Sequence, residues 1–523
     1  IMQNDTLLAI PFFTLMGIIL ERSRMAEDLL STIAQVFGPV RGGLAVAVVL
    51  VGALLAATTG VVAAAVISMG LISLPIMLRY GYNRTIAMGT ITASGTLAQA
   101  LPPSLVLIVL ADQLGRSVGD MYAGALIPGL MLVGLYLLFI AAVAIFLPKW
   151  VPALPKEARI YTEPSGASGH KSLLALLAVC GGVSWLWGMN HEAIMNPLIG
   201  RENPPGRDEV LIMSITVGSF LALALALINR LFKLGLLSRL AEQVTFVLIP
   251  PLVLIFLVLG TIFLGIATPT EGGAMGALGA LIMAGSRRTL SFKLLKEALE
   301  NTTKLAIFVL FILIGSTVFS FTFNAADGHI WVEHLFDKLP GGQLGFLLFV
   351  NALVFVLGMF IDFFEIAFIV VPLLAPVAEK LDINLIWFGI ILAMNLQTSF
   401  LTPPFGFALF YLRSVAARAD YDDVITGKRI KAVTTAQIYK GSIAFIVLQL
   451  IMVATIILNP GLVTGNLDKP VVVDEAAVEN LLNYMPSVDF GAPPAPDFGI
   501  PAPDAGGAAE EDPAKALEEA IKQ

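Results

Sequence analysis

Charge and cysteine are scarce in this sequence of 523 residues, and each shortage excludes a class of protein. Charged side chains make up 13% of the chain, about half the share of an ordinary soluble domain. Because so few charges cannot cover a soluble surface, a cytosolic enzyme, a nucleic-acid-binding protein and a disordered scaffold are poor interpretations. The single cysteine, Cys180, excludes an intrachain disulfide and a cysteine-based metal cluster. Hydrophobic side chains make up 57%, which indicates a membrane protein.

The negative charge is concentrated at the C-terminus. Residues 466–523 hold twelve acidic and three basic side chains, more than enough to account for the formal net charge of −7. The rest of the chain is near neutral, and nothing in its charge indicates a nucleic-acid partner. Because the segment is also rich in Pro, Ala and Asp, we expect a disordered tail.

Long apolar runs follow one another through most of the chain. A bilayer-spanning helix needs about 20 apolar residues, and the runs lie at 5–21, 43–75, 86–111, 121–147, 172–190, 210–232, 244–265, 270–285, 304–323, 344–378, 384–412 and 441–459. Two of them carry a central Pro-Pro, and 43–75 contains Thr58-Thr59-Gly60. Lipid cannot replace the backbone hydrogen bonds that such breaks remove. We therefore expect the breaks to be buried in protein or to line a wet cavity.

An internal repeat relates the two halves of the chain. An offset of 301 carries five positions onto the same residue type, namely Pro39, Pro75, Asn83, Pro102 and Pro103 onto Pro340, Pro376, Asn384, Pro403 and Pro404. Tyr122 and Gly124 match Tyr439 and Gly441 at an offset of 317, so the second half holds extra residues, which we place at 413–431. The alternative is a chance alignment of helix breakers in an apolar chain. A true repeat with paired broken helices is typical of secondary transporters.

The charged loops bear on the orientation of the halves. The loop 79–84 holds two arginines and no acid, whereas its partner 380–385 holds Lys380 and Asp382. The positive-inside rule would place the first loop in the cytoplasm and the second outside, as inverted repeats require. The basic runs 287–304 and 413–440 are further candidates for cytoplasmic loops.

These patterns divide the chain into four parts. We predict a first membrane repeat at 1–147, a linker at 148–209 with an extra apolar helix, a second repeat at 210–465 and the tail at 466–523. In the linker, Trp185 and Trp187 are expected as interfacial anchors at the end of a span, and His170 and His191 as loop residues. A complete duplication would pair 243–300 with positions before residue 1, so we expect an N-terminal segment of the natural protein to precede Ile1.

Two matched segments combine small residues, hydroxyls and a double proline. The candidate binding residues are Ser94, Gly95, Thr96, Pro102, Pro103 and Ser104 in the first, and Asn395, Gln397, Thr402, Pro403 and Pro404 in the second. A helix broken at these positions would free carbonyls for a hard cation and leave a helix N-terminus that suits a carboxylate. The alternative is a pair of structural kinks in which Ser and Thr bond back to the backbone. The matched pair favours a binding site.

Acidic residues also occur within apolar runs. Asp362 and Glu365 are three residues apart and would share a helix face, where they could balance a cation, relay a proton or face water at the end of a span. Glu271 follows Pro269-Thr270 and begins a helix rich in Gly and Ala, so a capping role is favoured over a ligand role.

Signatures of an energy-coupling or catalytic centre are missing from the sequence. We find no phosphate-binding Gly-x-x-x-x-Gly-Lys-Ser/Thr run, no His-Glu-x-x-His pattern and no nucleophile elbow. The four histidines are scattered, so a membrane-embedded enzyme is disfavoured. We expect energy from an ion gradient or from a partner, with no bound cofactor.

At these residues the sequence resembles a known family. Ala9-Ile10-Pro11-Phe12-Phe13, Ala93-Ser94-Gly95-Thr96, Pro269-Thr270-Glu271-Gly272 and the run from Asn395 to Gly406 are similar to the large membrane subunit of tripartite ATP-independent periplasmic (TRAP) transporters. Asp362-Phe363-Phe364-Glu365 and the run that follows resemble the mannitol/chloroaromatic-compound branch. The resemblance covers 4–147 and 243–460.

The resemblance implies an all-α polytopic membrane protein of two inverted repeats with re-entrant hairpins and broken helices. It implies an elevator-type, sodium-driven importer in the bacterial inner membrane, working with a small membrane subunit and a periplasmic solute-binding protein. The solute would carry a carboxylate, as a dicarboxylate, 2-oxo acid, lactate or sialic acid does. The hairpin tips would be 94–104 and 395–405, and sodium would be bound by Thr58, Thr59, Gly60, Gly95, Thr96, Asp362, Thr398 and Thr402.

One departure from the family pattern concerns the ion sites. Where the family has a stretch like Gly-x-Ser-Gly-Ser, this chain reads Ala57-Thr58-Thr59-Gly60-Val61, so its ion stoichiometry is open. The alternatives to a binding-protein-dependent importer are an ion- or proton-coupled exporter or permease that acts without a binding protein, and a channel-like subunit. The matched breaks argue against a channel.

Overall fold

A computed structural model describes residues 5–60, 62–158, 169–200, 204–337, 339–423, 425–465 and 467. The predicted tail at 466–523 lies outside the described residues except for Leu467. The described part is helical except for a two-stranded antiparallel hairpin, β1 (Tyr421–Asp422) and β2 (Arg429–Ile430). Seven of its helices are long and apolar enough to cross a membrane, or eight if the bent pair α1 and α2 forms one span. The predicted all-α polytopic fold is confirmed.

The first half begins with α1 (Asp5–Arg22), α2 (Met25–Phe37), α3 (Gly43–Thr59), α4 (Val62–Arg79), α5 (Arg84–Thr96), η1 (Leu97–Gln99), α6 (Leu105–Gln113) and α7 (Val118–Phe146). The short η2 (Lys156–Ala158) then precedes two long helices, α8 (His170–Ile199) and α9 (Arg207–Phe232). The predicted run 43–75 divides at Gly60, whose φ of +59° is the left-handed conformation that ends a helix.

The second half contains α10 (Arg239–Phe263), α11 (Pro269–Ser286), α12 (Phe292–Ala325), α13 (Gly328–Asp337), α14 (Gly342–Leu357), α15 (Phe363–Glu365), the π-helical turn η3 (Ile366–Val370), α16 (Val371–Lys380), α17 (Leu385–Phe400), α18 (Phe407–Val415), α19 (Thr435–Leu458) and α20 (Gly461–Thr464). Glu271 closes a capping box with Thr268 at the start of α11, which confirms its predicted role.

One end of the bundle is basic. The start of α3, the end of α4 and the end of α7 meet there, because Leu44 N donates to Tyr82 Oη and Asn83 N donates to the Trp150 carbonyl. The loop before α19 joins them through Arg84, which donates to two of its carbonyls. The basic side chains in these segments include Arg41, Arg79, Arg84, Lys149, Arg413 and Lys431. We call this group of segments the basic end; the positive-inside rule assigns it to the cytoplasm.

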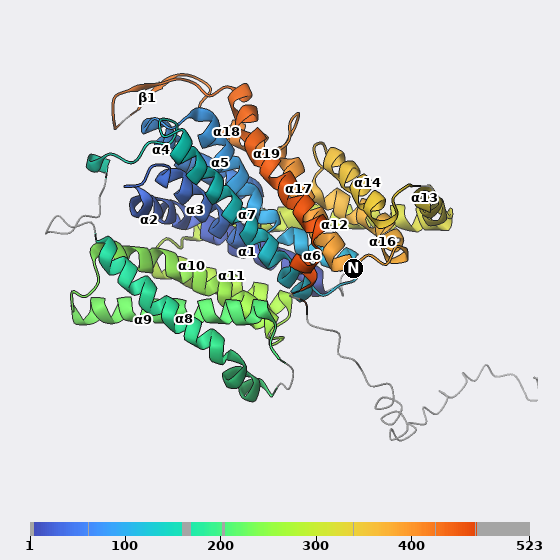
Figure 1. Ribbon diagram of the computed structural model, residues 1–523, viewed down its shortest axis with the longest axis horizontal. Helices are drawn as coiled ribbons and strands as arrows, with labels where there is room; N and C mark the ends of the chain where they lie inside the picture. The colour runs from blue at the N-terminus through green and yellow to red at the C-terminus, as the bar shows by residue number, and fades with distance from the viewer. Residues whose placement is uncertain are drawn as a thin grey trace, which may run out of the picture. The chain divides into compact units, whose positions relative to one another are not determined.

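A second group of segments meets at the opposite end, which we call the distal end. Gln343 at the start of α14 donates to the Leu381 carbonyl just after α16. Arg116, after α6, pairs with Glu379 of α16 at 3.2 Å. Trp387 at the start of α17 donates to the Ile456 carbonyl near the end of α19. Figure 1 shows α14 and α16 far from the β1 hairpin and α4.

The two ends reveal the course of the chain. Helices α3 and α4 form a hairpin that enters and leaves at the basic end, whereas α14 and α16 form one that enters and leaves at the distal end. The related helices α7 and α19 also run in opposite directions, since α7 ends and α19 begins at the basic end. The halves are therefore inverted, as predicted.

The predicted hairpin tips at 94–104 and 395–405 are wrong. Residues 84–113 start at the basic end and finish at the distal end, and residues 385–415 run the other way. Each is a crossing segment broken at its Pro-Pro. The hairpins turn instead at Gly60, which the sequence had marked only as a break, and near 358–362.

Matching elements occupy the repeated positions. Asn83 caps α5 by accepting from the amides of Thr85 and Ile86, and Asn384 caps α17 in the same way. The two matched Pro-Pro bonds, Pro102-Pro103 and Pro403-Pro404, are both cis. Helices α18 and α19 are separated by residues 416–434, whereas α6 and α7 are separated by 114–117, so the extra residues lie close to the predicted stretch 413–431.

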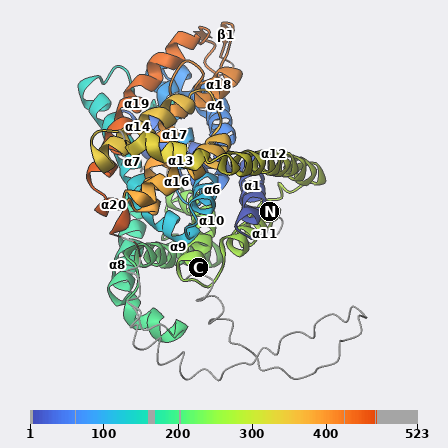
Figure 2. The ribbon, with the colours of Figure 1, turned by 90° about the vertical axis from the view of Figure 1, so that its right-hand side faces the viewer.

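The core and one flank differ in burial. Every residue of α17 is buried, and α5 is buried from Ile86 to its end, so these broken helices lie at the centre. Helices α8 and α9 pack on each other and on α10, on one flank of the bundle (Figures 1 and 2), and α8 exposes large apolar side chains such as Trp185. Trp185 and Trp187 lie inside α8, which continues beyond the apolar run to Ile199, so their role as interfacial anchors stays a prediction.

His191 also departs from its predicted loop position. It lies in α8 and is fully buried, with its Nε2 2.8 Å from Glu209 Oε1 of α9. Its Nδ1 accepts a hydrogen bond from Trp187 Nε1. The pair joins the two helices of the flank, so its role is structural.

Candidate functional site

The break in the first crossing segment is fully buried. Ser94, Thr96 and Ser104 are each 0% exposed, and Pro102 and Pro103 are buried beside them. Each hydroxyl donates to a backbone carbonyl: Ser94 to Thr90, Thr96 to Ala93, and Ser104 to Gln99, over 2.6 to 3.0 Å. The back-bonding of the structural alternative is therefore present. It occupies the hydroxyl protons and leaves lone pairs on the oxygens free to accept.

Gly95 lies where α5 meets α4. A Cβ added at Gly95 would come within 2.3 Å of the Val66 side chain and 3.1 Å of its backbone nitrogen. Close packing alone therefore requires glycine here. This packing contact neither supports nor excludes a binding role for Gly95, which stays a prediction.

The break in the second crossing segment is more open. Gln397 and Thr398 are 0% exposed and Asn395 is 2% exposed, but Thr402 and Pro403 are half-buried and Pro404 is exposed. Asn395 Nδ2 donates to the Asn351 carbonyl of α14 at 2.6 Å. Thr398 and Thr402 both donate to backbone carbonyls of α17, those of Met394 and Thr398. The second break thus has access to the surface that the first lacks.

Both breaks leave a helix without a side-chain cap. The hydroxyl of Ser104 precedes α6 but donates to the Gln99 carbonyl, and Gly406, which precedes α18, has no side chain. The first amide groups of α6 and α18 therefore lack a capping acceptor from these residues. The carbonyl ends of α5 and α17 lie on the other side of each break. Each break can accordingly offer donors to an anion and carbonyl oxygens to a cation.

The hairpin turns lie against the breaks. A Cβ at Gly60 would lie 3.1 Å from the Leu105 side chain, which places the turn of the first hairpin at the start of α6. A Cβ at Gly358 would lie 2.7 Å from Cβ of Ser399 in α17. The structure thus brings Gly60 to the first break, as the predicted grouping requires. The side chains of Thr58 and Thr59 lie outside the described part.

Asp362 begins the short helix α15. Its Oδ1 accepts from the Phe363 amide at 2.8 Å, which is an N-cap interaction. Glu365 Oε2 is buried without a hydrogen-bond partner in the described part. Asp362 therefore caps α15, and its predicted role in sodium binding stays a prediction. Its turn lies near the second break, because the Phe360 ring is 5.6 Å from the Phe405 ring.

A tyrosine connects the two breaks. Tyr136 Oη of α7 accepts from Gln449 Nε2 of α19 at 2.6 Å and lies 3.5 Å from Gln397 Nε2. Gln449 Nε2 also lies 3.5 Å from Thr96 Oγ1. Thr96 of the first break and Gln397 of the second are thus linked through two side chains of the long helices. All four residues are at most 1% exposed.

Several buried oxygens in this region have no partner among the described residues. They are Gln99 Oε1, Gln397 Oε1, Gln449 Oε1, Thr90 Oγ1 and Tyr122 Oη, and Gln99 Nε2 is also unpaired. A buried polar group without a partner costs about 1–3 kcal/mol. Such oxygens suit ordered water or a hard cation. No group of three or more His, Cys, Asp or Glu side chains in the described part could hold a metal, so a cation would be bound by amide, hydroxyl and carbonyl oxygens.

Tyr136 and Gln449 were not among the predicted site residues. Each is a polar group near the middle of an apolar run, at 121–147 and 441–459, and the rule that mid-membrane polar groups are functional could have identified them. Gln99 lies inside the predicted range 94–104 but was not selected.

Inverted hairpins with paired broken helices are typical of secondary transporters. Comparisons with known proteins show the family. Residues 1–195 and 211–462 match the family described as "Tripartite ATP-independent periplasmic transporter, DctM component". The chain belongs to this TRAP transporter family. The match includes most of α8 and α9, which the sequence resemblance had left outside.

Curated relatives are also named as large permease proteins of TRAP transporters. The C4-dicarboxylate TRAP transporter large permease protein DctM of Pseudomonas aeruginosa is 28% identical, over 79% of this chain and 78% of the relative. The ectoine TRAP transporter large permease protein TeaC of Halomonas elongata is 24% identical, over 81% and 80%. Among solved structures, the YdaH transporter of Alcanivorax borkumensis is 14% identical with a TM-score of 0.48, covering 88% of this chain and 85% of that one. The protein is thus a large permease subunit of the TRAP type.

Proposed function

We propose that this TRAP permease imports a carboxylate-bearing solute together with sodium. The observation that carries the proposal is the pair of breaks before α6 and α18, each with uncapped amides on one side and helix carbonyl ends on the other. Amide donors at a helix N-terminus suit the carboxylate, and carbonyl oxygens suit sodium. This arrangement recurs in secondary transporters whose broken helices bind substrate and ion at the midplane.

The solute contacts are proposed at the two breaks. The residues are those of the sequence prediction: Ser94, Gly95, Thr96, Pro102, Pro103 and Ser104, with Asn395, Gln397, Thr402, Pro403 and Pro404. The second break is the more accessible in this conformation, because Pro404 is exposed and Thr402 half-buried. A C4-dicarboxylate is our first choice of solute, in keeping with the name of the Pseudomonas relative.

Sodium is proposed to bind where the hairpin turns meet the breaks. The first such position is Gly60 beside the start of α6, with Gly95 and Thr96 in the adjoining helix. The second is the turn after α14, which packs on Ser399 near Thr398. Buried oxygens without a partner, such as Gln99 Oε1, support a hydrated or ion-binding interior.

An elevator movement is the proposed transport step. Helices α2 and α13 occupy matching places in the two repeats, directly before Pro39 and Pro340. Between α1 and α2 the chain bends by 60°, which suits an arm that carries a mobile domain past a fixed scaffold. The hairpins α3–α4 and α14–α16 would move with the central broken helices.

We also propose two partners, in the bacterial inner membrane. A small membrane subunit would complete the permease, and a periplasmic binding protein would deliver the solute at the distal end. The exposed apolar side chains of α8, such as Trp185 and Leu186, offer a surface for lipid or for the small subunit.

Uptake into liposomes tests the proposal. Liposomes would hold the chain with its small subunit, and the outside would contain sodium, the binding protein and radiolabelled C4-dicarboxylate. We expect uptake that stops when choline replaces sodium and when the binding protein is omitted. Unchanged uptake in choline would falsify sodium coupling. Uptake that needs no binding protein would favour the alternative, a permease that acts without one.

A further inference from the structure

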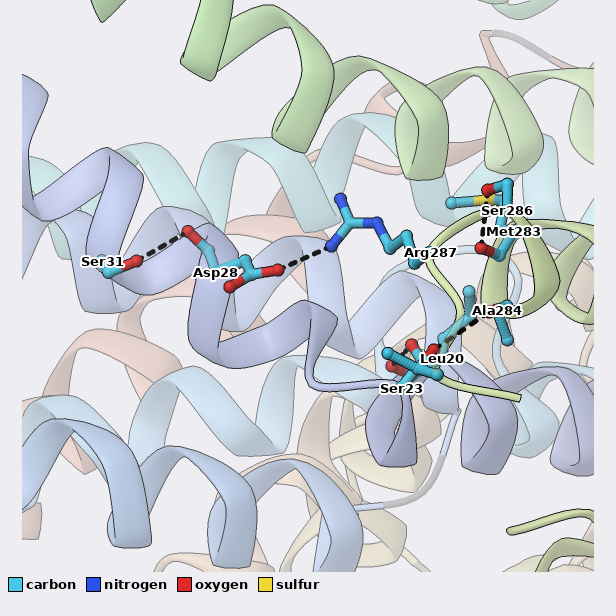
Figure 3. Close-up of polar contacts among 9 residues, drawn as sticks. Leu20, Ser23, Asp28, Ser31, Met283, Ala284, Ser286 and Arg287 are labelled. Carbon is cyan, nitrogen blue, oxygen red and sulfur yellow. Dashed lines mark hydrogen bonds and ion pairs between the residues drawn. The ribbon is translucent and has the colours of Figure 1, made fainter. Parts of the chain in front are cut away.

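A polar cavity lies at the bend between α1 and α2. Its volume is about 550 Å³, and it is bordered by the C-terminal ends of α9 and α11 and by the first turns of α10. Three arginines and one aspartate line it: Arg24, Arg230, Arg287 and Asp28. Figure 3 shows Asp28 and Arg287 reaching toward each other across this region. The transport site described above uses none of these residues.

The positive charge of the cavity is only partly balanced. Arg287 Nη1 lies 2.8 Å from Asp28 Oδ2, so one arginine has a carboxylate partner. The Arg230 guanidinium lies over the Phe246 ring, 5.2 Å from its centroid. Neither Arg24 nor Arg230 makes an ion pair with another described residue. Two guanidinium groups therefore remain for an anion, and guanidinium matches phosphate oxygens in geometry.

The cavity is close to the cytoplasmic surface of the membrane. Ser238, just before α10, donates to the Gly169 carbonyl, and His170 Nε2 lies 3.0 Å from the carbonyl of Val36 at the end of α2. Since the Leu154 amide donates to Gly38, these segments adjoin the basic end. At 1.5 Å per residue, the cavity residues Gln243 to Pro250 lie about 6 to 17 Å along α10 from its start. That depth corresponds to the headgroup region and the adjoining hydrocarbon.

Exposed apolar side chains follow lining residues of the cavity in the sequence. Leu231 and Phe232 directly follow Arg230 and are 68% and 71% exposed. Phe292, shortly after the lining residue Thr289, is 84% exposed. A free phosphate ion would gain nothing from these side chains, whereas the acyl chains of a lipid would cover them.

We propose that this cavity binds the phosphate group of an anionic phospholipid from the cytoplasmic leaflet. Arg24 and Arg230 would contact the phosphate, and the acyl chains would lie along Leu231 and Phe292. Basic pockets between helices on the cytoplasmic side bind anionic headgroups in this way. The lipid would connect the α1–α2 bend to α9 and α10, and its binding does not depend on the identity of the solute or of the coupling ion.

Lipid titration of the purified full-length chain tests the proposal. The melting temperature in detergent would be measured against phosphatidylglycerol, against phosphatidylcholine and against inorganic phosphate at the same concentrations. We expect phosphatidylglycerol alone to raise it. In the double variant Arg24→Gln/Arg230→Gln the apparent affinity for phosphatidylglycerol should fall about tenfold or more, since two charged contacts are lost.

Arg288→Gln is the matched control, because Arg288 adjoins the cavity in sequence but does not line it. It should titrate like the wild type. Equal phosphatidylglycerol affinity in the wild type and the double variant would overturn the proposal, as would an equal shift with phosphatidylcholine. A shift reproduced by inorganic phosphate would overturn the lipid as occupant. Melting of the double variant in phosphatidylcholine reports whether it is folded.

Discussion

Arg79 and Asp423, which are 344 residues apart, form a bidentate ion pair at the basic end. Arg79 Nε lies 2.9 and 3.0 Å from the two carboxylate oxygens, and its Nη2 lies 2.8 Å from Oδ1. Thr426 adds hydrogen bonds from its amide and hydroxyl to Asp423 Oδ2. Arg79 is the last residue of α4 and therefore ends the first hairpin. The ion pair holds the inserted segment 416–434 against that end of the hairpin.

Asp423→Asn should loosen this segment. The hydrogen bonds from Arg79, followed by those from Thr426, hold the pKa of Asp423 well below its ordinary value. A carboxylate with a lowered pKa stabilises the fold at every pH above its unfolded pKa of about 4, and the contribution is lost as the pH falls toward the folded pKa. Limited proteolysis at 416–434 should therefore be faster in the variant at pH 7, with the difference shrinking below about pH 4. Asp422→Asn, on the exposed neighbour, should behave like the wild type.

Tyr136→Phe should destabilise the centre of the molecule. It removes the hydroxyl that accepts from Gln449 and lies near Gln397, and it leaves Gln449 Nε2 with only the 3.5 Å contact to Thr96. We expect a loss of about 1–3 kcal/mol in the free energy of unfolding, measured by denaturant titration in detergent. Tyr122→Phe is the matched control, since the Tyr122 hydroxyl is buried and has no partner among the described residues. Equal effects of the two changes would contradict the linking role of Tyr136.

Gly95→Ala should disturb the packing of α5 on α4. The new methyl group would meet Val66 at 2.3 Å, and overpacking of this kind costs about 1–3 kcal/mol. Thermal unfolding in detergent measures the effect. Gly134→Ala, in α7 with open space around the added Cβ, should be tolerated. A fully stable Gly95→Ala variant would show that the two helices can separate at this point.

Thr96→Val and Thr402→Val should each weaken the sodium dependence of uptake, because each removes one hydroxyl oxygen while preserving the shape of the side chain. An apparent sodium affinity lower by several-fold would correspond to the loss of one ligand, worth about 1 kcal/mol. Both hydroxyls bond back to their own helix, so membrane insertion should be normal. Wild-type sodium dependence in both variants would assign these hydroxyls to the structural kinks alone.

Local signals predicted the helix boundaries well where a side chain acts within its own turn. Glu271 closes a capping box and the two matched Pro-Pro pairs break their helices, both as expected, while Asn83 and Asn384, which the repeat had matched, cap their helices. Each of these features depends on contacts only a few residues apart. His191 was predicted to lie in a loop but is buried in α8. Its partner Glu209 lies on another helix, so no signal near His191 in the sequence indicated the contact.

The direction taken after each break was beyond local prediction. A proline pair removes backbone hydrogen bonds whether the chain turns back or continues across, so the breaks at 94–104 and 395–405 could be taken for hairpin tips. Contacts such as Arg116 with Glu379 decide that the chain continues. The Tyr136 and Gln449 pair was missed for the same reason, since the contact joins residues 313 positions apart on two helices.

Low charge, apolar periodicity and proline spacing can all be read along the chain, and they were enough to establish the membrane class, the two related halves and the positions of the breaks. The fold was needed to show that Arg79 meets Asp423, that the hairpins turn at Gly60 and near Gly358, and that Thr96 and Gln397 share a buried network. These relationships join residues hundreds of positions apart, and in a mostly apolar chain no local signal specifies which helices pack together.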